Sequence, residues 1–236
     1  MTRIVKDPDE RRSELIACAQ NLFYSKGYES TSVRDIADEA GVAKGTFYYY
    51  FDSKQAVLEA TVDELTAYSV ALMRGIVDDE ALSAEAKWVR AMEMVGNWKT
   101  ARKTELVALL RMLQRDENAL LQEKIRTKAM QMVAPELARI IKQGVEEGVF
   151  ETEFVDESAE IAMATMTTLS YSIADTLLNP GNYDNPGDLL RRKLTAVQTA
   201  TERVLGAAPG SLPLMDAATL DIWFEDREEP QREKVL

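Results

Sequence analysis

Residues 40–54 decide the fold: they read AGVAKGTFYYYFDSK and contain five consecutive aromatic residues, from Phe47 to Phe51. The whole chain of 236 residues has only 3 Trp, 8 Tyr and 6 Phe. Because a helix turns by about 100° per residue, five consecutive side chains point in every direction around its axis. Some of these aromatic side chains must therefore face away from the core.

The segment before this run predicts a short helix and a tight turn. In TSVRDIADEAG, residues 31–41, Ser32 precedes Asp35 by three positions, which is the spacing of a capping box. Gly41 suits the turn, and Val42 leads into a second short helix that carries the aromatic residues. Two short helices joined in this way predict a helix-turn-helix, which presents its second helix to the DNA major groove.

The remainder of the chain also has a helical pattern. Apolar residues recur at spacings of three and four, and no run of alternating β-branched residues predicts a strand. A first helix should end near Gly27, which suits the left-handed position after a helix, and Tyr28 can fold back onto Phe23. Ser53 can cap a long helix over residues 54–77. We therefore expect an all-α protein.

The expected domains differ in charge. Residues 1–54 hold 8 basic and 9 acidic residues, whereas the rest of the chain holds 20 basic and 31 acidic residues. A local basic face is thus possible in the first segment despite the net charge of −12. We expect a three-helix DNA-binding domain at 1–54, a long helix leading into a larger helical domain at 55–206, and a tail at 207–236.

Composition excludes several classes of site. The chain has no His and one Cys, Cys18, which removes most metal sites, His-activated nucleophiles and any intramolecular disulfide. No metal or cofactor is expected. The charged start has no signal-peptide pattern, and the 14-residue uncharged run 161–174 is too short to span a bilayer. We expect a cytoplasmic protein with no membrane partner.

The run from Leu15 to Leu58 closely resembles the DNA-binding domain of the tetracycline-repressor (TetR) family. Ala43 departs from it, because many members carry a Ser there that can cap the third helix. The resemblance implies a dimeric, ligand-responsive transcription regulator, most often a repressor. Its partners would be a palindromic double-stranded DNA operator and a small-molecule effector, which the sequence does not identify.

A helical wheel separates the aromatic residues. Phe47, Tyr50 and Phe51 can face the core, while Tyr48 and Tyr49 lie on the opposite side. Hydroxyl and ammonium groups on that side can donate to DNA phosphates. With the phosphate contacts that the resemblance implies, the expected DNA-binding residues are Thr31, Ser32, Arg34, Lys44, Gly45, Thr46, Tyr48, Tyr49 and Lys54. The alternative is that all five aromatic residues form a small core.

A second expected site is an effector cavity in the larger domain. Methionines adapt to varied ligands and recur on the predicted helices between residues 83 and 178. The candidate lining residues are Trp98, Met112, Met130, Met166 and Tyr171. Pro135 should kink a helix near Ala134 and could open a gap. Alternatively, these side chains are ordinary core.

The last long helices are candidates for a dimer interface. Apolar and small residues from Leu190 to Val204 follow a 4-3-4-3 spacing, and the helix expected over 156–178 is rich in Ala, Ser and Thr. In the TetR family the last two long helices form a four-helix bundle between two subunits. We therefore expect a homodimer through residues 156–205, with an intrachain core as the alternative.

Two other functions compete with this reading. One is an all-helical enzyme that uses carboxylates, although GVAKGT at 41–46 is not a phosphate-binding loop and no pair of carboxylates stands out. The other is an architectural DNA-binding protein without an effector. Catalytic turnover without DNA binding would favour the enzyme, and the lack of an enclosed cavity would favour the architectural protein.

Overall fold

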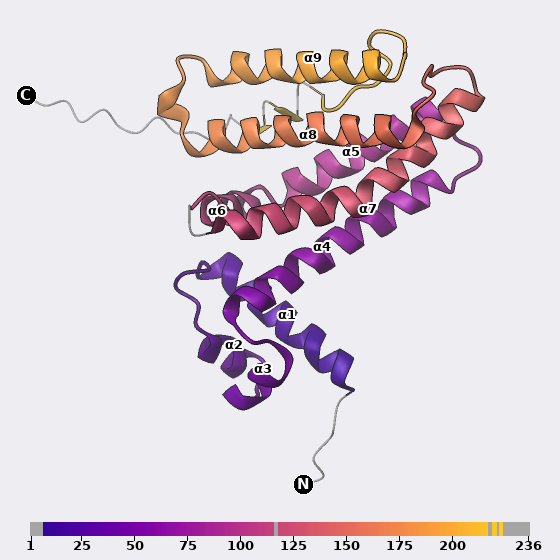
Figure 1. Ribbon diagram of the computed structural model, residues 1–236. Coiled ribbons are helices and arrows are strands. Elements are labelled where there is room, and N and C mark those ends of the chain that lie inside the picture. The colour runs from indigo at the N-terminus through magenta and orange to yellow at the C-terminus, as the bar shows by residue number, and fades with distance from the viewer. Residues whose placement is uncertain (1–6, 116–117, 217–218, 221, 224–236) are drawn as a thin grey trace, which may run out of the picture. The chain divides into compact units, whose positions relative to one another are not determined.

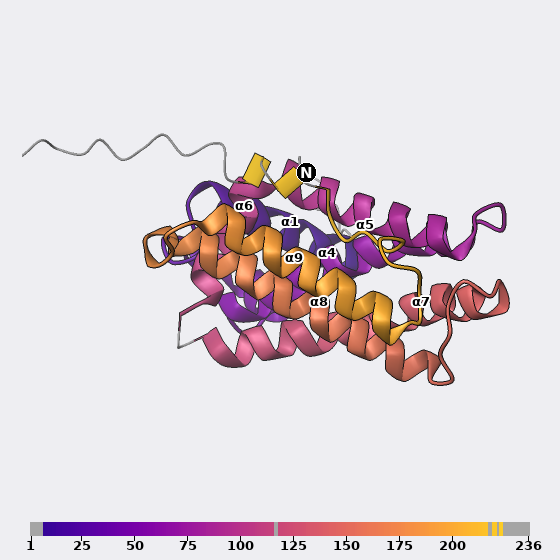
Figure 2. The ribbon, with the colours of Figure 1, turned by 90° about the horizontal axis from the view of Figure 1, so that it is seen from above.

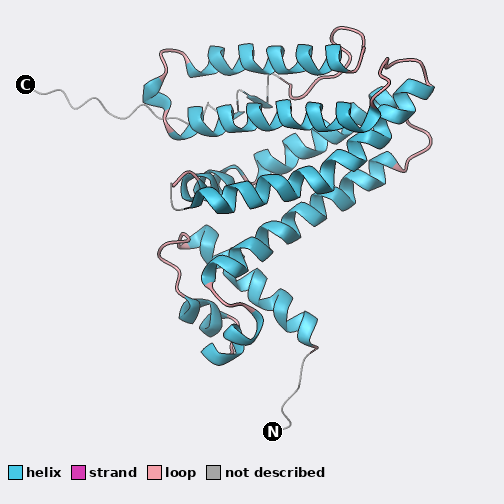
Figure 3. Cartoon of the chain, viewed as in Figure 1, coloured by secondary structure: helices cyan, strands magenta, loops and turns pink. Residues whose placement is uncertain are grey.

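The computed structural model describes residues 7–115, 118–216, 219–220 and 222–223, and within these ranges every regular element is a helix (Figure 3). The all-α prediction is confirmed. The elements, labelled as in Figure 1, are α1 (Pro8–Ser25), α2 (Val33–Glu39), α3 (Lys44–Tyr50), α4 (Lys54–Val77), α5 (Ala84–Ala101), α6 (Lys103–Leu113), α7 (Ala119–Glu146), α8 (Val155–Leu178), a 3-10 turn (Pro180–Asn182) and α9 (Pro186–Val204).

The chain forms two compact units. The first contains the described residues up to Ala71 together with Ala108–Met132, and the second contains Leu72–Val107 and the described residues from Val133 onward. These bounds differ from the expected 1–54, 55–206 and 207–236. The difference arises because α6 and the first half of α7 supply apolar side chains, including Leu113 and Leu121, to the core of the first unit.

Within the first unit, α1, α2 and α3 precede the long helix α4 (Figure 1). Helix α1 ends at Ser25, and Gly27 has the left-handed φ of 87° that glycine adopts without strain. The Tyr28 ring then lies 5.1 Å from the Phe23 ring, between centroids, as the sequence predicts. Ile36 and Phe47 are fully buried between these helices.

A small cavity of about 40 Å³ lies within the first unit. Its apolar walls come from the end of α1, the first half of α4, and α6, including Phe23, Leu58 and Met112. Pockets for drug-sized molecules measure about 300–1,000 Å³. This cavity therefore cannot enclose an organic effector.

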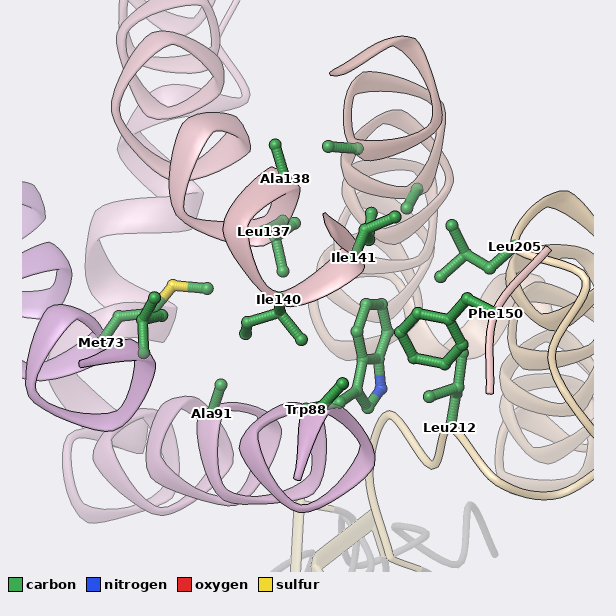
Figure 4. Packing of buried hydrophobic residues seen from close by; sticks show 14 of the residues in the cluster. Met73, Trp88, Ala91, Leu137, Ala138, Ile140, Ile141, Phe150, Leu205 and Leu212 are labelled. Atoms are coloured by element: carbon green, nitrogen blue, oxygen red, sulfur yellow. The ribbon is translucent and has the colours of Figure 1, made fainter. Parts of the chain in front are cut away.

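The second unit packs around Trp88 of α5. Figure 4 shows its indole ring beside the ring of Phe150, with Ile141 of α7 and Leu212 of the tail close by. The indole N–H donates a hydrogen bond of 3.2 Å to the carbonyl oxygen of Pro213. Trp88 thus joins a helix to residues more than a hundred positions later in the chain.

Phe150 depends on a glycine in α7. A Cβ atom built on Gly144 would lie 2.0 Å from a ring carbon of Phe150, far inside van der Waals contact. The glycine therefore lets the aromatic ring lie directly on the helix backbone. Helix α7 itself runs on through Pro135 as one continuous element from Ala119 to Glu146.

Helices α8 and α9 lie side by side as an antiparallel pair (Figures 1 and 2). Leu190 and Thr201 of α9 are fully buried, and the Thr201 hydroxyl lies 3.4 Å from the Thr165 hydroxyl of α8. Another face of α8 leaves apolar side chains accessible, with Ile161 48% and Tyr171 47% exposed. Part of this pair is therefore intrachain core and part is free surface in the single chain.

The described part of the tail packs on the second unit. Leu212, Leu214 and Trp223 are buried, and the Glu202 carboxylate of α9 accepts hydrogen bonds from the backbone N–H groups of Gly210 and Leu212 at 2.9 and 3.3 Å. The rest of the expected tail, residues 224–236, lies outside the described residues.

Candidate nucleic-acid interface

Helix α2 begins with the predicted capping box. The Ser32 hydroxyl accepts a 3.1 Å hydrogen bond from the Asp35 backbone N–H, and the Asp35 carboxylate accepts one of 2.7 Å from the Ser32 backbone N–H. That backbone bond, the Ser32 hydroxyl and the Lys26 ammonium at 3.0 Å together hold the pKa of Asp35 well below its usual range. The box fixes where α2 begins and thus how it meets the turn.

The side chain of Thr31 points into the protein, whereas its position beside the start of α2 suggests an exposed hydroxyl. Its side chain is 1% exposed, and its hydroxyl donates to the carbonyl oxygen of Gly27 at 2.7 Å. The hydroxyl is therefore held inside the turn in this structure, and its contact with a phosphate stays a prediction. The sequence shows a polar residue beside a helix start, but only the fold of the preceding turn places its hydroxyl inside.

Helix α3 separates the aromatic residues into two faces. Phe47 is 0% and Phe51 4% exposed, whereas Tyr48 is 48% and Tyr49 78% exposed. The alternative of a purely aromatic core therefore does not hold for these two tyrosines. Their faces follow directly from the helical period that the sequence predicts.

The outer side of α3 carries groups that suit a phosphate backbone. Lys44 and Gly45 are exposed beside the two tyrosines, and Thr46 is half-buried. The Lys44 ammonium lies 5.7 Å from the centroid of the Tyr48 ring, so the cation and one hydroxyl lie on the same surface. Ala43 provides no side-chain cap, as expected from the missing Ser. Gly45 removes a side chain that would hold the helix away from a ligand.

Two other residues that are predicted to contact DNA have partners within the protein. Arg34 is exposed and lies 3.6 Å from Asp38, an arrangement that leaves it accessible from solvent. Lys54 is half-buried, its ammonium donates to the carbonyl oxygen of Tyr28 at 2.7 Å, and it lies 4.1 Å from the centroid of the Tyr28 ring. Lys54 therefore has a structural contact that the sequence did not reveal.

The candidate effector residues do not gather in one cluster. Met112 is buried in the first unit, and Met130 lies half-buried on the part of α7 that belongs to that unit. Met166 packs against the core of the second unit, and Trp98 lies half-buried on α5. Tyr171 is exposed on α8. An effector cavity lined by all five residues remains a prediction.

The described residues offer neither a metal site nor a membrane span. These residues contain no group of three or more metal-ligating side chains. None of their helices has the length and the apolar character needed to cross a bilayer.

The comparisons with known proteins agree with the geometry of the first unit. Residues 15–61 match the model of bacterial regulatory proteins of the tetR family. The repressor KstR2 of Rhodococcus jostii is 45% identical over 69 residues, which cover 29% of this chain and 28% of that protein. The chain spans less than half the length of the curated relatives it matches.

Solved structures resemble the chain over a greater length. The fatty acid degradation regulator FadR of Bacillus halodurans has a TM-score of 0.58 and 25% identity, covering 85% of this chain and 96% of that chain. FadR of Bacillus subtilis, solved in complex with stearoyl-CoA, has a TM-score of 0.57 and 19% identity, covering 83% and 98%. The second likeness concerns the fold alone.

Proposed function

We propose that this chain, whose N-terminal segment is a DNA-binding domain of the tetR family, is a dimeric transcription regulator that represses from a palindromic operator. A small-molecule effector bound by the second unit would release the operator. Curated proteins that the chain resembles are helix-turn-helix transcriptional regulators, which makes regulation the function best supported.

The observation that carries the proposal is the two-sided character of α3. Burial of Phe47 holds the helix on the core, while Tyr48, Tyr49 and Lys44 remain available on the other side. Phosphate contacts of this kind position a protein on DNA, and base contacts add specificity. Arg34, exposed on α2, and Thr46, half-buried on α3, are the candidates to add such contacts.

The dimer would form through residues 156–205. Ile161 and Tyr171 are accessible on α8 in the single chain, and covering them would bury apolar surface. Two copies related by a two-fold axis would present two α3 helices to one DNA face. In dimeric helix-turn-helix proteins the half-sites lie about 34–36 Å apart, one helical turn of DNA, or a multiple of it.

The effector would bind in the second unit. The cavity of about 40 Å³ in the first unit is too small for one, and Met166 packs beside the larger core around Trp88. The ligand of Bacillus subtilis FadR, stearoyl-CoA, gives a chemical starting point for a screen. If the effector binds one state of the dimer more tightly than the other, effector binding and operator binding would be coupled by typically about 1–3 kcal/mol.

The test is selection of bound sequences from a random DNA pool with the full chain. We expect an enriched two-fold symmetric sequence, bound by a protein that light scattering shows to be a dimer at micromolar concentration. Enrichment of no sequence, or of an asymmetric site bound by a monomer, would contradict the proposal. A compound screen against the enriched operator then tests release by an effector.

A further inference from the structure

Lys99 lies on the inner side of α5. It follows Trp88 by eleven residues, so the two side chains leave the helix within about 20° of each other. Trp88 and Ala91, on the same side, are both fully buried. Lys99 itself is half-buried, so part of the residue packs against the protein and part of it remains accessible from solvent.

Among the residues that the structure describes, neither Lys99 nor its neighbour Arg102 has a compensating anion. Across the described ranges, no side-chain hydrogen bond or carboxylate ion pair involves either residue. Arg102 stands three positions after Lys99, and its guanidinium lies 5.0 Å from the ring centroid of Trp98. Burial lowers the pKa of the Lys99 ammonium.

Several other cations in the same unit have partners. Lys87, a buried residue of α5, donates to the carbonyl oxygen of Val77 at 2.6 Å. The buried Glu136 carboxylate accepts from Arg74 at 2.5 Å and from Arg139 at 3.0 Å. The Lys103 ammonium donates to the carbonyl oxygen of Ile222 at 2.8 Å. Lys99 and Arg102 thus differ from their neighbours.

A shortage of carboxylates does not explain the difference. Residues 55–236 hold 31 acidic and 20 basic residues. Removing a cation from water without a counter-charge is unfavourable, and a ligand anion can supply that counter-charge. The ring of Trp98 and the methionines that pack against this core, Met92, Met94, Met163 and Met166, offer apolar contacts in the same unit.

We propose that Lys99 and Arg102 form the anion-binding part of the effector site, and that the effector is an organic acid with an apolar body. Its carboxylate or phosphate would accept hydrogen bonds from the Lys99 ammonium and the Arg102 guanidinium. Its apolar body would contact Trp98 and the neighbouring methionines. The inference rests on the proposed function, in which the second unit binds a small molecule.

The experiment measures binding to the full chain without DNA, so that it is independent of operator release. Dodecanoate and dodecanoyl-CoA are the acidic probes, one with a carboxylate and one with phosphates, and 1-dodecanol is the uncharged control. We expect calorimetry to give tighter binding of at least one acidic probe. Lys99→Met should weaken the binding of that probe about tenfold or more and leave the binding of 1-dodecanol unchanged. Arg102→Gln should act in the same direction.

Lys103→Met is the matched control, because its ammonium already has a protein partner. It should leave the preference for the acid unchanged. Lys99→Met should also raise the melting temperature of the ligand-free chain, since an uncompensated charge is removed. If neither acidic probe binds more tightly than 1-dodecanol, or if Lys99→Met keeps that preference, the inference is overturned.

The two proposals can fail separately. If an uncharged compound releases the operator and the acidic probes do not bind, the regulatory function stands and the anion site fails. If an acidic probe binds through Lys99 without changing operator affinity, the anion site stands and release by this ligand fails.

Discussion

The ammonium group of Lys54 lies 2.7 Å from the carbonyl oxygen of Tyr28, and that oxygen also accepts a 3.2 Å hydrogen bond from the backbone N–H of Thr31. The first residue of α4 is thus joined to the loop that carries the start of α2. A residue that the sequence suggests as a phosphate contact therefore also connects two parts of the first unit.

Lys54→Met tests this structural role. Methionine retains an apolar chain of similar length but removes the ammonium donors, so we expect the first unit to lose about 1.5–3 kcal/mol of unfolding free energy. Urea unfolding measures the change. Lys44→Met, at an exposed position, is the control and should leave stability unchanged. If Lys54→Met weakens operator binding at full stability, the contact to Tyr28 is not structural.

Tyr48→Phe and Tyr49→Phe test the phosphate contacts. Each removes one exposed hydroxyl, so operator and unrelated DNA should both be bound more weakly by about 0.5–1.5 kcal/mol per contact, with no change in melting temperature. Fluorescence anisotropy with labelled duplexes gives the affinities. Tyr68→Phe, which removes an exposed hydroxyl from α4, should change neither quantity. Unaltered affinity in both α3 variants would disprove the contacts.

Lys44→Ala should change the salt dependence of binding. Each phosphate that is no longer neutralised reduces the slope of log affinity against log salt by about 0.9, or about twice that in a dimer with both copies changed. Affinities measured across a salt series give the slope. Lys142→Ala, at an exposed position on α7, should preserve the wild-type slope. The same slope in Lys44→Ala would exclude a phosphate contact.

Phe47→Ala should destabilise the first unit. The side chain is fully buried, so its removal leaves a cavity and costs about 3–5 kcal/mol. Tyr49→Ala, from the exposed side of the same helix, should be close to neutral in stability. Calorimetry of the two variants provides the comparison. Equal losses of stability would mean that the two faces of α3 are wrongly assigned.

Ile161→Asp tests the proposed dimer. A carboxylate at this exposed position of α8 would be buried against the partner subunit, so we expect a monomer at micromolar concentration. Light scattering after size exclusion gives the mass. Phe154→Asp, at an exposed residue just before residues 156–205, is the matched control and should remain dimeric. A dimer in both variants would place the interface elsewhere.

The sequence by itself determined the features that depend on neighbours along the chain. The capping box of Ser32 and Asp35, the turn at Gly27 and the two faces of α3 arise from hydrogen bonds and helical periods that extend over a few residues. A local pattern predicts these features because the interacting groups are neighbours in sequence as well as in space.

Tertiary structure alone decided which of the side chains predicted to contact DNA already have hydrogen-bond partners within the protein. Thr31 has a hydroxyl and Lys54 an ammonium in the sequence, but Gly27 and Tyr28 accept from them only when α1, the loop and α4 are packed together. Met112 joins the core of the first unit because α6 returns to it. That Lys99 has no partner among the described residues is of the same kind. It depends on how side chains distant in sequence pack around α5, and helical periodicity carries no information about that packing.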